Sequence, residues 1–66
     1  MKLTWRDPDE IAWALQAQHP SQDPLRLSFP KLHQMILALP DFADEPQGSN
    51  EGVLERIQMA WYEETR

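Results

Sequence analysis

The side chains most able to do chemistry in this sequence are carboxylates, and nine of the eleven fall in two stretches that contain no Lys or Arg. These stretches span residues 7–25 and 32–55. Their acids are Asp7, Asp9, Glu10 and Asp23 in the first and Asp41, Asp44, Glu45, Glu51 and Glu55 in the second. Carboxylate oxygens suit hard cations such as Ca²⁺, Mg²⁺ or oxidised iron, and an acidic surface also attracts basic protein faces. The pattern therefore predicts a positive partner, either a metal ion or a basic protein surface.

Some of these acids have a second explanation. Four of them fall in the first turns of predicted helices, where negative charge complements the helix dipole: Asp7, Asp9, Glu10 and Glu51. For these four, both roles stay open. The acids at positions 41–45 precede the third predicted helix by several residues, so capping does not explain them. They point to an external partner.

Catalysis has little support in the sequence. There is no cysteine to act as a nucleophile. Ser49 is better explained as a helix N-cap, because no histidine lies near it in sequence. Gly48 and Gly52 bracket a helix start and do not form a phosphate-binding loop. His33 flanks an apolar stripe, and we expect it to be half-buried and hydrogen-bonded. We therefore expect a protein that is not an enzyme.

Three proline-free stretches are long enough to form helices. The first is predicted to begin with Asp7 as N-cap and Pro8 at the first helical position, and to end at the proline at position 20. The second runs from near Pro30 to the proline at position 40. The third begins after an N-cap at Ser49 or Asn50 and runs to about residue 64.

Apolar residues recur at helical spacing and predict the core. The stripes are Ile11, Ala14, Leu15 and Gln18; Leu32, Met35, Ile36 and Leu39; and Val53, Leu54, Ile57, Ala60 and Trp61. Phe42 is expected to anchor the loop between the second and third helices. Residues 2–6 and 25–29 alternate apolar and polar side chains, as half-buried strands do, and their pairing would give a two-stranded β ribbon.

Trp13 falls outside these stripes. It lies about 200° around the first helix from Ile11, on the face opposite the apolar stripe. Two roles are open for it. It is either an interface side chain, or it folds back over Asp9, Glu10 or the chain termini.

Length and charge bound the remaining possibilities. The chain has 66 residues, with 6 basic and 11 acidic side chains and a formal charge of −5. That predicts one domain over residues 1–66 with a thin core, and it argues against nucleic-acid binding. No apolar run reaches the roughly 18–20 residues of a membrane span. We expect a cytoplasmic monomer with no membrane or nucleic-acid partner.

One set of motifs extends over essentially the whole chain without a gap. It comprises Leu3-x-Trp5-x-Asp7, Glu10-Ile11, Asp23-Pro24, Phe29, Leu32-His33, Asp41-Phe42-x-Asp44-Glu45-Pro46-x-x-Ser49-Asn50-Glu51, and Leu54-Glu55-x-Ile57 through Trp61. This pattern resembles the IscX family, the small acidic proteins of the bacterial iron–sulphur cluster assembly system. The stretch from Phe42 to Glu51, together with the spaced tryptophans, is its most specific part.

The resemblance implies a mainly α, three-helix domain of modified winged-helix type. It also implies an adaptor or regulator that binds the cysteine desulfurase IscS, in competition with frataxin and ferredoxin, and binds iron weakly with no tightly bound cofactor. The alternative is an iron donor or carrier for the cluster scaffold. The expected metal ligands are Asp7, Glu10, Asp41, Asp44, Glu45 and Glu51. The expected partner-binding residues are Asp7, Glu10, Trp13, Asp23, Asp41, Asp44 and Glu45.

The chain departs from the family pattern in places. One acid is missing before Asp23, Pro30-Lys31 replaces a capping Thr and an acid, and Trp13 occupies a usually polar site. These departures shift the expected iron site toward the loop at 41–51. The third helix would be the recognition helix of a winged helix, but it carries mainly acids, which disfavours DNA.

Overall fold

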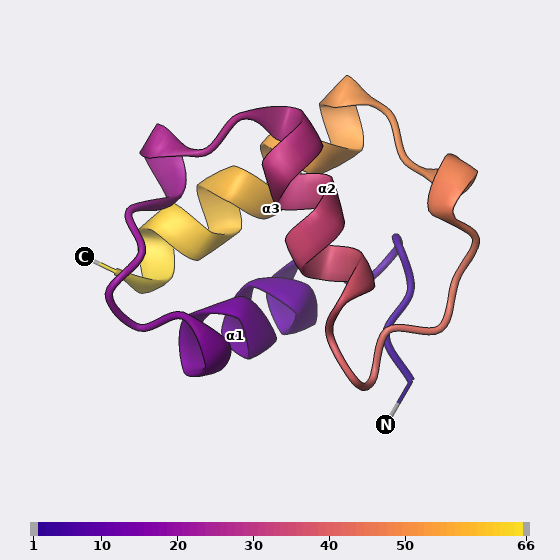
Figure 1. The fold of residues 1–66 in the computed structure, drawn as a ribbon, viewed down its shortest axis with the longest axis horizontal. Coiled ribbons are helices and arrows are strands. Elements are labelled where there is room, and N and C mark those ends of the chain that lie inside the picture. Colours follow the sequence, from indigo (N-terminus) through magenta and orange to yellow (C-terminus); the bar gives the residue numbers. More distant parts are fainter. Residues whose placement is uncertain (1, 66) are drawn as a thin grey trace.

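Three α-helices pack around one apolar core in the computed structural model, which describes residues 2–65 (Figure 1). The elements in chain order are α1 (Pro8–Gln18), the 3₁₀ helix η1 (Pro24–Arg26), α2 (Phe29–Leu37), the 3₁₀ helix η2 (Pro46–Gly48) and α3 (Glu51–Glu64). Helix α1 has its largest contact with α3, and α2 packs against both. The predicted three-helix, mainly α architecture is confirmed. No helix within residues 2–65 is long and apolar enough to cross a membrane.

The helices begin where the sequence predicts, although their caps differ in kind. Asn50 Oδ1 accepts a hydrogen bond from the backbone N–H of Val53 at 2.9 Å and so caps α3. Ser28 caps α2 in the same way, at 3.4 Å. Asp7 holds the N-cap position of α1, but its carboxylate turns back and accepts from the backbone N–H and hydroxyl of Thr4 at 3.0 and 3.1 Å. It closes the preceding turn and does not cap the helix.

The core confirms most of the predicted stripes. Its buried residues are Leu3, Trp5, Ile11, Ala12, Leu15, Leu32, Ile36, Leu39, Leu54, Ile57 and Trp61. Phe42 is partly buried and packs on this cluster, as expected for a loop anchor. In α1 the stripe includes Ala12, whereas Gln18 is exposed at the end of the helix.

The prediction of a strand at residues 25–29 is wrong, because local turn chemistry outweighs the alternation of side chains. Asp23 Oδ1 accepts from the N–H of Leu25 at 3.0 Å, and Pro24 starts a 3₁₀ turn. Leu25 is 51% exposed, and Phe29 already belongs to α2. The predicted two-stranded ribbon does not form within the residues that the structure describes.

The N-terminal run pairs with the loop after α2 instead. Leu3 forms an isolated parallel bridge with Phe42. Its N–H donates to the carbonyl of Asp41 at 2.7 Å, and its carbonyl accepts from the N–H of Ala43 at 2.8 Å. Leu3 and its neighbours in residues 2–6 therefore lie beside the acidic residues at 41–45.

Candidate functional site

The acidic loop, defined as residues 41–48, is bound to the N-terminal segment, defined as residues 2–7. Both lie at the same end of the molecule in Figure 1. Besides the bridge at Leu3, the backbone N–H of Trp5 donates to Asp44 Oδ2 at 3.1 Å. The indole N–H of Trp5 donates to the carbonyl of Glu45 at 2.6 Å. Asp7, which belongs to the first acidic stretch, binds Thr4, and the next residue, Trp5, binds Asp44 of the second stretch. The fold thereby brings acids of the two stretches into the same region.

Trp5 is the residue on which the acidic loop packs. Its ring meets Phe42 edge-on, with ring centroids 4.6 Å apart, and stacks on His33 at 5.5 Å with an interplanar angle of 10°. His33 also binds the loop, because its Nε2 lies 2.8 Å from the carbonyl oxygen of Pro46. The prediction of a half-buried, hydrogen-bonded His33 is confirmed.

Sequence reasoning missed this role of Trp5, which was seen only as part of an alternating apolar run. Its partners lie 39 and 40 residues away along the chain, so no local pattern connects them. The structure explains one residue of the loop: at Gly48 an added Cβ would lie 2.7 Å from Trp5 Cδ1, so glycine lets the loop cross the ring closely.

Asp44 has both carboxylate oxygens engaged with the backbone. Oδ2 accepts from the N–H of Trp5, and Oδ1 accepts from the N–H of Glu45 at 2.7 Å. These two hydrogen bonds, with a smaller contribution from the charge of Arg6, hold the pKa of Asp44 below its ordinary value. Asp44 therefore stays ionised and fixes the loop, while its carboxylate remains at the surface.

The other predicted acids at this end are less constrained. Asp41 and Glu45 have exposed side chains on the loop, and Glu51 is exposed in the first turn of α3. Glu10 is half-buried in the first turn of α1. Within residues 2–65, no three His, Asp or Glu side chains come close enough together to hold a metal ion.

The acidic loop and the N-terminal segment together form what we call the acidic end of the molecule. It contains the most specific part of the sequence pattern. A family model described as iron–sulphur cluster assembly, the IscX family, matches residues 3–66. The chain belongs to the IscX family. The resemblance inferred from the sequence is thus confirmed. An uncharacterized protein of Pseudomonas aeruginosa is also similar, with 47% identity over 64 residues that cover 97% of this chain and 97% of the relative.

The surface of this IscX-family member is less purely acidic in space than along the chain. The N-terminal segment carries Lys2 and Arg6, which are both exposed. They lie on the segment that binds the acidic loop, and the charge of Arg6 acts on Asp44. The fold therefore places Lys2 and Arg6 beside the acidic loop, although the loop belongs to a stretch of sequence that contains no base. Acids still outnumber bases here, and those of the loop face solvent.

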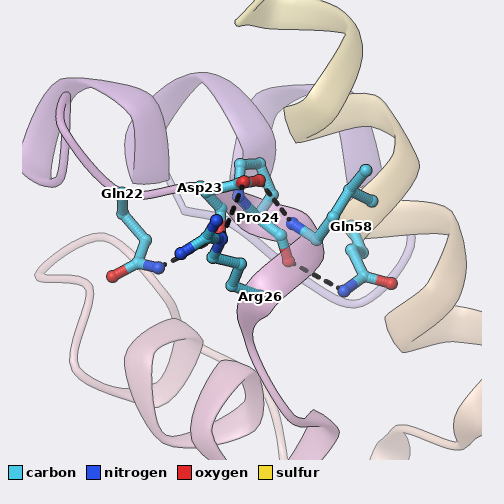
Figure 2. A network of polar contacts seen from close by, with 6 residues as sticks. Gln22, Asp23, Pro24, Arg26 and Gln58 are labelled. Carbon is cyan, nitrogen blue, oxygen red and sulfur yellow. Dashed lines mark hydrogen bonds and ion pairs between the residues drawn. The ribbon is translucent and has the colours of Figure 1, made fainter.

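Asp23 lies apart from the acidic end. Figure 1 places η1, which follows Asp23, at the end of the IscX fold opposite the acidic loop. The Oδ2 atom of Asp23 lies 3.6 Å from Arg26 Nε. Figure 2 shows this pair beside a second contact, in which Gln58 Nε2 donates to the carbonyl of Pro24 at 2.8 Å. Asp23 thus organises the turn that packs on α3, and its charge is balanced locally.

Trp13 is exposed, as predicted from its position opposite the core stripe, with 54% of its surface accessible. Its indole N–H donates to Glu64 Oε1 at 2.8 Å. The side chain therefore combines features of both roles left open by the sequence. It reaches the end of α3 near the C-terminus, and it still presents much of its ring to solvent.

Proposed function

We propose that this protein is an acidic adaptor that docks on the cysteine desulfurase IscS and regulates iron–sulphur cluster assembly. Membership of the iron–sulphur cluster assembly family supports the process. The observation that carries the docking role is the acidic loop held on Trp5, with Asp41 and Glu45 facing solvent. A surface that is ordered before binding loses little freedom on association, and its charge steers a basic partner toward it. Frataxin and ferredoxin would compete for the same basic face.

Iron is proposed as a weakly held regulator of this docking. The carboxylates at the acidic end do not gather in threes within the described residues, which supports weak and reversible binding. A cation bound at Asp41 or Glu45 would offset part of the charge that attracts the desulfurase. Iron would therefore reduce docking. The same dispersion of ligands makes a role as iron carrier for the scaffold the less favoured alternative.

We further propose that the three helices form a modified winged helix that has no DNA-binding role. In such a fold, α3 would be the recognition helix. It carries Arg56 against four acids, Glu51, Glu55, Glu63 and Glu64. A phosphate-contacting helix needs the opposite sign of charge. The protein is also proposed to act in the cytoplasm as a monomer, with no catalytic activity of its own.

The test is titration of IscS with this protein at low and moderate salt. Asp41→Asn combined with Glu45→Gln removes two exposed charges while leaving Asp44 to hold the loop. We expect affinity to fall by about tenfold or more for this double variant, and to fall with salt for the wild type. Asp23→Asn is the matched control, because that charge is already paired with Arg26. Absence of any association of the wild type at low salt would contradict the proposal.

Iron binding, measured on the same variants, separates the two functions. Loss of both desulfurase binding and iron affinity supports an adaptor whose docking iron regulates at these two side chains. Loss of desulfurase binding with iron affinity intact still supports the adaptor, and it contradicts the assignment of iron to Asp41 or Glu45. If the double variant loses iron but still binds the desulfurase normally, the carrier is favoured. Wild-type binding measured with and without iron then tests the proposed regulation.

A further inference from the structure

Trp13 presents an aromatic surface that is held in one orientation. An indole has a single polar hydrogen, and in Trp13 that hydrogen is donated to Glu64 Oε1 at 2.8 Å. The 54% of the residue that stays exposed is therefore mainly apolar ring. The bond connects α1 to the last turn of α3, so the ring is positioned by two helices. Trp5 and Trp61, by contrast, are buried in the core.

Among the residues that the structure describes, the charged side chains placed beside this ring by helix spacing and by its hydrogen bond are acids. Asp9 and Glu10 precede Trp13 by four and three residues, which places them on the neighbouring turn of the same helical face. Glu64 contacts the indole from α3. No Lys or Arg occurs anywhere in α1. A positive side chain is the group that this surface attracts.

Trp has the ring that binds cations best among the aromatic side chains, because its face carries partial negative charge. Arginine fits here better than lysine, since its planar guanidinium can stack on the ring while an N–H reaches a carboxylate. The second carboxylate oxygen of Glu64 is the acceptor beside the ring. We propose that Trp13 and Glu64 form a docking subsite for an arginine side chain on the basic surface of a protein partner.

This inference rests on the proposed function, because the partner is taken to be the desulfurase. The first turn of α1 joins the N-terminal segment that holds the acidic loop, and Trp13 lies one turn further along. The docking surface would thus extend from the acidic loop along the exposed face of α1. A second copy of the chain is a poorer occupant, since each copy carries a charge of −5.

The first experiment measures the affinity of Trp13→Leu, Trp13→Phe and Glu64→Gln for IscS, with unfolding curves to show that each variant is folded. We expect binding weaker by roughly tenfold or more for Trp13→Leu, and a smaller loss for Trp13→Phe, which keeps an aromatic face. Leu25→Ala is the control, because Leu25 is 51% exposed but lies beside the balanced pair of Asp23 and Arg26. It should bind like the wild type.

Each outcome decides one point. Wild-type affinity in Trp13→Leu, with the acidic-loop variants still impaired, would overturn the subsite and leave the proposed function standing. Wild-type affinity in Glu64→Gln, which keeps an acceptor for the indole but removes the charge, would overturn the contact with a cation. If the wild type does not bind the desulfurase at all, the proposed function fails, and the second experiment still decides whether the subsite accepts arginine.

That second experiment uses a triarginine peptide as the probe and follows the indole N–H signals by NMR. The Trp13 signal should move in a saturable way, and more than with a trilysine peptide. The buried indole of Trp61, which is bonded to Gln16, serves as the internal reference, because the indole of Trp5 is bonded to the acidic loop and would respond to a peptide bound there. An unmoved Trp13 signal would overturn the proposal. So would a shift of that signal with protein concentration alone, which would assign the ring to a second copy of the chain.

Discussion

Gly48 lies against the ring of Trp5, and a methyl group at this position should loosen the acidic loop. An added Cβ would lie 2.7 Å from Trp5 Cδ1 and 3.1 Å from Nε1. The ring has little room to withdraw, because Phe42 and His33 pack against it and its N–H is bonded to Glu45. Gly48→Ala must therefore push the loop outward or rotate the ring, and either movement disturbs that hydrogen bond.

The magnitude follows from two opposing effects. Overfilling a packed site costs about 1–3 kcal/mol. Gly48 does not have a positive φ, so alanine also restricts the unfolded chain, which returns about 0.4–1 kcal/mol. At the midpoints of these two ranges the net loss is about 1.3 kcal/mol, equivalent to roughly 5–10 °C in Tm for a domain of this size.

Gly52→Ala is the matched control. Gly52 lies in the first turn of α3, and an added Cβ there meets only Asn50 Oδ1, at 3.3 Å. Alanine favours the helix by up to about 1 kcal/mol, so this variant should melt at or above the wild-type temperature. Thermal unfolding followed by circular dichroism measures both variants. A Gly48→Ala protein that melts as high as the wild type would refute the close packing of loop on ring.

Two further predictions concern single side chains. Asn50→Ala removes the cap on Val53 and should lower the free energy of unfolding by about 1 kcal/mol in urea denaturation; an unchanged midpoint would contradict the capping role. The lowered pKa of Asp44 means that its ionised form stabilises the loop above the ordinary Asp range and that this stabilisation is lost as pH falls through the lowered pKa. The NMR shift of the Trp5 amide should therefore titrate with a midpoint below about 3.9, and a midpoint at or above that value would refute the assignment.

The helices were predictable because their signals are local. Pro8 marks the first position of α1, Asn50 caps α3, and the prolines at 20 and 40 confine the first two helices. Around residues 23–29 two local signals compete, and the pattern of alternation predicts the wrong structure. Alternation at 25–29 suggested a strand, but Asp23 and Pro24 impose a 3₁₀ turn through a hydrogen bond that forms within three residues.

The sequence predicts which acids belong to the candidate site, but it does not predict how those acids are arranged in space. The acids at 41–45 stood out because helix capping did not explain them. The role of each acid depends on contacts between residues distant in sequence. Asp44 binds Trp5 and holds the loop, whereas Asp41 and Glu45 have no such contact with Trp5 through their side chains and are exposed. For the same reason, no local pattern predicts that the fold brings Arg6 close enough to influence Asp44.

The pairing of Leu3 with Phe42 also has a consequence for the order of folding. Because synthesis proceeds from the N-terminus, residues 2–7 are made early but cannot find their partners until the segment containing Asp44 and Glu45 has emerged. Closing so long a loop carries an entropic cost that the local turns of α1 and α2 avoid. The helices can therefore form first, and the acidic surface is completed late. Under the proposed function, a nascent or partly folded chain would therefore bind its basic partner poorly, and docking would require a completely folded protein.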